Sequence, residues 1–177
     1  MRTFISIEIP REIKDKIVNT QNDLKKLDID ATYPFKKNIH VTLLFLGEKT
    51  DDRIKEIKER LFILKFNKFT VELKGLGAFP NLNRINVVWI GSNSNELIYL
   101  NDAICKQINQ KNDKDFSVHL TITRIKSSKN IDKIRDFIKQ NRDINFGSFE
   151  VKSFVLKKST LTSSGPIYED LETFYLS

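Results

Sequence analysis

The chain has 177 residues, of which 40% are hydrophobic and 30% charged, and these proportions are ordinary for a soluble globular protein. Its 30 Lys and Arg outnumber its 23 Asp and Glu, so the formal net charge is +7, which suits an anionic partner such as RNA without identifying one. The single cysteine, Cys105, excludes an intramolecular disulfide, and no apolar run approaches the length of a membrane span. The N-terminus has no signal-peptide core, so we expect a cytoplasmic protein that does not bind a membrane.

The first half of the chain predicts strands and helices in alternation. Period-two patterns indicate strands, and apolar residues at helical spacing among charged residues indicate helices. The expected elements, in order, are a strand at 4–9, a helix at 10–27, a connection at 28–38, a strand at 39–46, a helix capped by Asp51 or Asp52, a strand from Phe69, and a loop at 75–80.

The second half repeats this order. Its expected elements are a strand at 85–90, a helix at 95–110, a strand at 118–125, a helix capped by Asn130, a strand at 149–156, and a late strand at 168–175. The amino-acid sequence repeats as well: residues 52–57 match 132–137, and residues 69–72 match 149–152, both at an offset of 80. We therefore expect one α+β domain over 1–177, with two pseudo-twofold-related lobes. Each lobe is a largely antiparallel sheet with outer helices, and a cleft lies between them.

Two copies of one short motif stand on the middle strand of each half. The chain has only two histidines, and both are followed two residues later by threonine, in His40-Val41-Thr42-Leu43 and His119-Leu120-Thr121-Ile122. Successive side chains of a strand point to opposite faces, so each histidine shares a face with its threonine. Each motif thus places an imidazole and a hydroxyl on one face of its strand.

This pair of motifs suits chemistry on a phosphodiester. An imidazole titrates near neutrality, so one histidine can be a neutral base while the other is a protonated acid. Threonine hydroxyls can donate hydrogen bonds to the non-bridging oxygens of the phosphate. The chain has too few histidines and cysteines for a zinc site and no Gly-rich P-loop, so we expect neither a metal nor another cofactor.

The ordered set of motifs resembles the two-histidine (2H) phosphoesterase superfamily, in particular its RNA 2′,3′-cyclic phosphodiesterase (2′-5′ RNA ligase) branch. The resemblance covers nearly the whole chain, including segments 2–7, 38–48, 76–80, 119–126, 159–161 and 165–168. Two positions depart from it. Relatives often have a basic residue at the position of Leu44 and proline at that of Val118.

The resemblance implies a metal-independent phosphodiesterase that opens a terminal 2′,3′-cyclic phosphate of RNA and leaves a 2′-phosphomonoester. It assigns His40 as proton donor to O3′ and His119 as the acceptor that activates water, with Thr42 and Thr121 on the phosphate oxygens. The residues alone do not order the two histidines. The reverse reaction, with an RNA 5′-hydroxyl in place of water, would form a 2′-5′ linkage. The implied partners are cyclic-ended RNAs, with tRNA halves among the candidates, and we expect a monomer.

Four further residues are candidate substrate contacts. Arg124 occupies the basic position that follows the second motif, but strict alternation from His119 turns it away from the cleft, so it contacts the substrate only if the strand twists or ends there and is otherwise a solvated or structural arginine. Phe79 and Arg84 flank a loop that either binds a base or a phosphate or is an ordinary surface loop. Phe4 shares a strand face with residues 6 and 8 and lies either under the site or in the core.

Two other functions remain open at this point. One is a 2H phosphoesterase that acts on a small cyclic nucleotide or a 2′-5′-linked oligonucleotide. The other is a nucleotide- or RNA-binding module without turnover, although a binder has no need of two titrating histidines. Turnover of a cyclic-ended RNA distinguishes the three.

Overall fold

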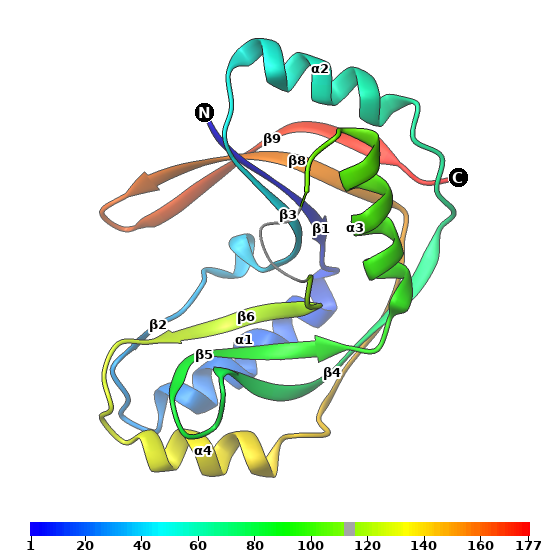
Figure 1. Ribbon diagram of the computed structural model, residues 1–177. Helices are drawn as coiled ribbons and strands as arrows, with labels where there is room; N and C mark the ends of the chain where they lie inside the picture. The colour runs from blue at the N-terminus through cyan, green and yellow to red at the C-terminus, as the bar shows by residue number, and fades with distance from the viewer. Residues whose placement is uncertain (112–115) are drawn as a thin grey trace.

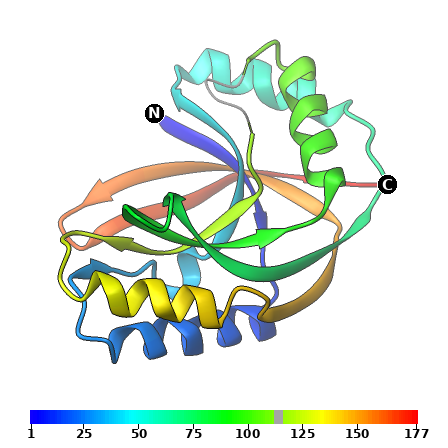
Figure 2. The same ribbon diagram turned by 60° about the horizontal axis from the view of Figure 1, so that its bottom comes forward.

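The computed structural model describes residues 1–111 and 116–177, and it has two lobes (Figure 1). The upper lobe contains a four-stranded sheet in the order β3-β1-β8-β9, and the lower lobe a five-stranded sheet in the order β2-β6-β5-β4-β7. Helices α2 and α3 lie on the outer side of the upper lobe, and α1 and α4 on the outer side of the lower lobe (Figures 1 and 2). All strand pairs are antiparallel in the part of the chain that is described. The expected α+β fold with two antiparallel sheets is confirmed.

The bounds of the elements follow. In chain order they are β1 (Arg2–Glu8), α1 (Arg11–Lys25), β2 (Ala31–Thr32), the short 3₁₀ helix η1 (Lys36–Asn38), β3 (His40–Glu48), α2 (Asp51–Phe62), β4 (Phe69–Pro80), β5 (Ile85–Ser92), α3 (Asn95–Gln107), β6 (His119–Ile125), α4 (Ile131–Gln140), β7 (Asn145–Val151), β8 (Ser153–Thr162) and β9 (Gly165–Tyr175).

Each lobe is assembled from both halves of the chain. Helix α1 follows β1 of the upper sheet but packs against β6 and β7 of the lower sheet. Helix α3 follows β5 of the lower sheet but packs against β3 of the upper sheet. The two H-x-T strands, β3 and β6, also contact each other across the lobes. Apolar residues from both lobes form one continuous core, so the lobes are packed together rather than joined only by the chain.

Each H-x-T strand has a β-bulge one residue after its threonine. In the upper sheet Thr42 pairs with Ser6 while Leu44 pairs with Ile5, so Leu43 is the extra residue. In the lower sheet Thr121 and Thr123 pair with consecutive residues of β5, so Ile122 is the extra residue. A bulge resets the alternation of the strand. Two adjacent residues are therefore buried, and the side chain that follows returns to the face of the histidine.

A buried amide side chain binds the carbonyl group at each bulge. Asn101 of α3 donates from Nδ2 to the Leu43 carbonyl at 2.6 Å. Gln21 of α1 donates from Nε2 to the Ile122 carbonyl at 3.0 Å and to the Pro34 carbonyl at 3.1 Å. Both amides are almost fully buried, and the two residues are 80 positions apart, the same offset as the sequence repeat. The two lobes thus fix their H-x-T strands in the same way.

The expected helix caps are only partly correct. The N-cap of α2 is Thr50, whose Oγ1 accepts from the Arg53 N–H at 3.3 Å, so neither Asp51 nor Asp52 is the cap. Asn130 is at the N-cap position of α4, as expected, but with a left-handed backbone. Its amide donates to the carbonyls of residues 27 and 28 instead of capping the helix.

Two strand predictions are wrong at their ends. Residues 75–80 were expected to form a loop, but they continue β4, because they pair with β5 as far as Pro80. The single strand expected at 149–156 is two strands, since β7 ends at Val151 in the lower sheet and β8 begins at Ser153 in the upper sheet. The chain therefore crosses between the lobes at Lys152. The late strand is confirmed as β9.

Among the residues that the structure describes, no helix is both long enough and apolar enough to cross a membrane.

The bulge bonds lead to a prediction about stability. Replacing Asn101 with leucine leaves the Leu43 carbonyl buried without its donor, which costs about 1–3 kcal/mol. We expect Asn101→Leu to lower the free energy of unfolding by that amount in urea denaturation. Asp102→Asn, at an exposed position of the same helix, is the control and should unfold like the wild type. Equal stability of Asn101→Leu and the wild type would show that the bond does not support the bulge.

Candidate active site

His40 lies at the start of β3 and is held by contacts on several sides. Its Nδ1 is 2.7 Å from the Asn38 carbonyl oxygen, and its Nε2 is 3.0 Å from Thr42 Oγ1. The ring stacks on Phe4 at 5.1 Å between centroids and meets the ring of Tyr168 edge-on at 5.4 Å. Because a carbonyl only accepts, Nδ1 is the protonated nitrogen in the neutral ring, and Nε2 is the nitrogen available for proton transfer.

His119 is held in the same way at the start of β6. Its Nδ1 is 2.8 Å from the Ser117 carbonyl oxygen, again two residues upstream. The ring meets Phe79 edge-on at 4.9 Å. Both histidines therefore have the same tautomer, with Nε2 as the nitrogen left for chemistry. The strands that carry the two H-x-T motifs, β3 and β6, contact each other across the lobes.

Charged groups surround His40 unequally. Burial lowers the pKa of His40 below its ordinary value of 6.5, while the Asn38 carbonyl and the charge of Glu8 raise it in part. Glu8, the cross-strand partner of His40, is ion-paired with Lys157 at 2.8 Å and with Lys14 at 3.3 Å. Both lysines lower the pKa of His40. A buried Lys157 also reaches Asp170 at 2.6 Å, so the cluster under His40 is nearly balanced in charge.

Arg124 points into the cleft, and the expectation that it points away is wrong. The bulge at Ile122 shifts the alternation of β6, so Arg124 is exposed on the same face as His119 and Thr121. Its charge acts on Tyr168 of the other lobe: burial raises the pKa of Tyr168, while Arg124 lowers it. Arg124 therefore faces the ring that touches His40.

The other three candidate contacts have different positions. Phe79 lies on β4 and its ring meets His119, so it borders the site. Phe4 is only 3% exposed, so it supports the ring of His40 and has little surface to offer a ligand. Arg84 is exposed and lies between the end of β4 and the start of β5. It is three residues before Val87, the residue of β5 that pairs with Arg124. It lies at the far tip of the lower lobe's hairpin.

Trp89 is a residue of the site that the sequence analysis missed. It pairs with Thr121, and its ring lies across Gly77 and Gly91, where a Cβ at Gly77 would collide with it. The ring also contacts Phe79 at 5.2 Å. In the sequence Trp89 is one residue of the strand expected at 85–90. The sequence signal for its role was Gly91, two residues after Trp89, which pairs with His119. A flat ring that lies on a sheet needs neighbouring positions without side chains.

Two buried polar atoms have no protein partner among the described residues, Ser6 Oγ and Trp89 Nε1. Ser6 pairs with Thr42 and Trp89 pairs with Thr121, so the two occupy equivalent positions beside the two threonines. Buried polar groups are normally hydrogen-bonded. One buried polar atom without a protein partner therefore lies on the strand next to each threonine.

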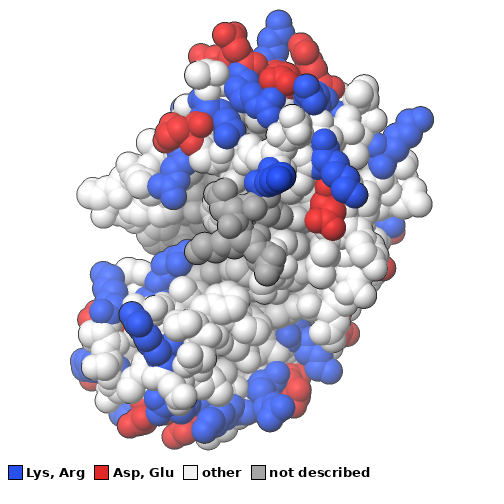
Figure 3. Space-filling model, in the orientation of Figure 1, with Lys and Arg blue, Asp and Glu red and all other residues white. Residues whose placement is uncertain are grey.

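The surface is hollowed between the lobes, with Lys and Arg side chains on both sides of the hollow (Figure 3). In the described part of the chain, no group of three or more His, Cys, Asp or Glu residues is placed to hold a metal ion. The site as described thus consists of two imidazoles, two threonine hydroxyls, aromatic rings and one exposed arginine.

The sequence is similar to those of known proteins. The family model described as LigT like Phosphoesterase matches residues 7–89 and 94–168. A protein of Methanocaldococcus jannaschii named RNA 2′,3′-cyclic phosphodiesterase is 39% identical over 172 residues, which cover 96% of this chain and 97% of the relative. A protein of Archaeoglobus fulgidus with the same name is 37% identical and covers 98% of this chain and 99% of its own length.

Solved structures have the same fold. A crystal structure from Thermus thermophilus superposes with a TM-score of 0.82 at 23% identity, covering 99% of this chain and 97% of the other. The apo form of E. coli LigT superposes with a TM-score of 0.81 at 24% identity, covering 99% of this chain and 97% of the other.

The environment of His40 leads to a prediction for the free protein. NMR titration of the two imidazoles, assigned with His119→Ala, should give His40 a pKa below 6.5, because burial disfavours the charged ring. Glu8→Gln should lower this pKa further, since it removes the negative charge that raises the pKa and breaks the ion pair with Lys14, while Lys157 keeps its ion pair with Asp170. Glu12→Gln, an exposed change in the first turn of α1, should leave it unchanged. A His40 pKa above 6.5, or one that rises in Glu8→Gln, contradicts this electrostatic account.

Proposed function

The chain belongs to the LigT-like phosphoesterase family, and we infer from this that it is an RNA 2′,3′-cyclic phosphodiesterase. The observation that supports this most directly is the pair of equivalent imidazoles, each with Nδ1 on a backbone carbonyl and Nε2 left for proton transfer. Neither a binding module nor a structural protein requires such a pair.

The proposed reaction is in-line attack of water on the cyclic phosphate. His119 Nε2, whose lone pair is free in the neutral ring, takes a proton from water. His40 is protonated on Nε2, and it donates this Nε2 proton to O3′ as the P–O3′ bond breaks. The product is a 2′-phosphomonoester. The assignment of donor and acceptor follows the resemblance to the 2H superfamily.

The threonines and Arg124 have proposed roles on the phosphate. Thr42 and Thr121 share the strand face of their histidines and are placed to donate to the non-bridging oxygens. In neutral His40 the Thr42 hydroxyl donates to Nε2, but protonation of Nε2 frees this hydrogen for the phosphate. Arg124 adds a positive charge on the cleft face of β6.

The substrate itself supports the acid role of His40. Burial lowers the pKa of His40 in the free protein, which disfavours the protonated ring that the donor role requires. A bound phosphodiester brings a negative charge, and a negative charge next to an imidazole raises its pKa. Binding of the substrate therefore prepares the donor. Reversal of the same steps with an RNA 5′-hydroxyl in place of water would give 2′-5′ ligation.

The test is hydrolysis of an RNA with a 2′,3′-cyclic end in the presence of EDTA, with the position of the product phosphate determined by ³¹P NMR. We expect a 2′-phosphate. His40→Ala and His119→Ala should each lower turnover by about 10²–10⁴-fold, the usual contribution of one positioned acid or base.

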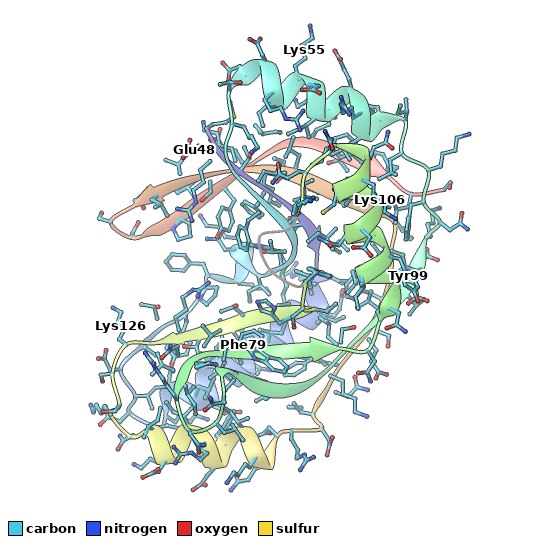
Figure 4. All side chains as sticks on the ribbon, in the orientation of Figure 1. Glu48, Lys55, Phe79, Tyr99, Lys106 and Lys126 are labelled. Atoms are coloured by element: carbon cyan, nitrogen blue, oxygen red, sulfur yellow. The ribbon has the colours of Figure 1, made fainter. Side chains whose placement is uncertain are left out.

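The control is Lys106→Ala, an exposed change on the outer helix α3 (Figure 4). It should match the wild type. A 3′-phosphate product, activity restored only by a divalent ion, or full activity of either histidine variant would contradict the proposal. Turnover of cyclic mononucleotides but not of RNA would favour the small-nucleotide alternative.

A further inference from the structure

Exposed apolar side chains lie at the outer end of the upper lobe, beyond the site described above. Phe35 is 56% exposed and Leu161 is 67% exposed. Leu161 pairs with Pro166 near the tip of the β8–β9 hairpin. A Cβ on Gly165 would lie 3.8 Å from Phe35 Cε2, so the ring of Phe35 rests beside this tip. We refer to Phe35, Leu161 and Pro166 as the hairpin patch.

The hairpin patch is connected to the histidine site by the backbone. Asn38, whose carbonyl holds His40, donates from Nδ2 to the Pro166 carbonyl at 2.9 Å. The pairing of β8 with β9 is regular from Lys157 to Thr162, so Pro166 and Tyr168 share one face of β9. Tyr168 touches His40 on that face. The hairpin patch therefore extends the wall of the site outward.

Positive charge faces this wall from the lower lobe. Arg124 acts on Tyr168, and Lys126 follows at the outer end of β6 (Figure 4). Both side chains are exposed. Asp170, the carboxylate on the same face of β9, is already ion-paired with Lys157. The outer end of the site thus combines an exposed ring with two exposed basic side chains that form no ion pair with the residues the structure describes, and rings with basic side chains are the chemistry that binds single-stranded nucleic acid.

We propose that the hairpin patch binds the base of the nucleotide upstream of the cyclic-ended one, with Arg124 and Lys126 near the intervening phosphate. This inference rests on the proposed function and specifies its substrate as an oligonucleotide. The terminal phosphate lies at the histidines, so the RNA must leave the site along its outer wall. Phe35 stacks on the upstream base, and Leu161 packs beside it.

The test compares two product-like ligands that undergo no reaction, adenosine 2′-phosphate and the dinucleotide ApA with a terminal 2′-phosphate. Binding is followed by the emission of Trp89, the single tryptophan, which contacts Phe79, and the ring of Phe79 in turn meets His119. The wild type should bind the dinucleotide about tenfold more tightly, the usual effect of one stacked base. Phe35→Ala should bring the ratio of the two dissociation constants close to one, and Leu161→Ala should reduce it.

Phe62→Ala is the matched control, since Phe62 is an equally exposed ring at the end of α2, and it should keep the wild-type ratio. Equal affinity of the wild type for both ligands, or an unchanged ratio in Phe35→Ala, would overturn the proposal. Hydrolysis of the matching dinucleotide with a 2′,3′-cyclic end is measured in parallel. Absence of that hydrolysis refutes the proposed function, whereas the binding ratios judge the upstream site by themselves.

Discussion

The hydrogen bond from a buried helix amide to a bulged strand carbonyl is the interaction on which the site depends. Asn101 makes it to β3 and Gln21 makes it to β6. A bulge leaves a backbone group without its ladder partner, and such a group is unfavourable in a core unless another donor binds it. The amide makes the bulge tolerable, and the bulge turns Phe45 and Arg124 to the face that already holds the histidine and threonine.

The two histidines are held by equivalent backbone contacts but have different neighbours. His40 lies among Phe4, Tyr168 and the ion-paired Glu8, whereas His119 lies beside Phe79. Two identical imidazoles in identical surroundings would titrate together, and an acid–base pair needs them in opposite protonation states. The pseudo-twofold fold supplies the geometry, and the neighbouring residues supply the asymmetry.

Much of the fold was predictable because it follows from local patterns. Alternation indicated the H-x-T strands, and the repeat indicated two lobes, since both are periodic in the residues themselves. The bulges were not predictable, because the residues at 43–44 and 122–123 fit a regular strand as well. Arg124 was therefore assigned to the wrong face. Trp89 was missed because its role depends on Gly91 of the same strand and Gly77 of the neighbouring strand. Gly77 comes to lie under the ring only through the pairing of β4 with β5.

The central claim is that the two histidines act together on one phosphate, and a double-mutant cycle tests it most directly. The values of kcat/KM for a 2′,3′-cyclic nucleotide are compared for the wild type, His40→Ala, His119→Ala and the double variant. Groups that act as one unit give strongly non-additive losses. The account predicts a double variant within a few-fold of the slower single variant, whereas losses that multiply would show that the two histidines contribute independently.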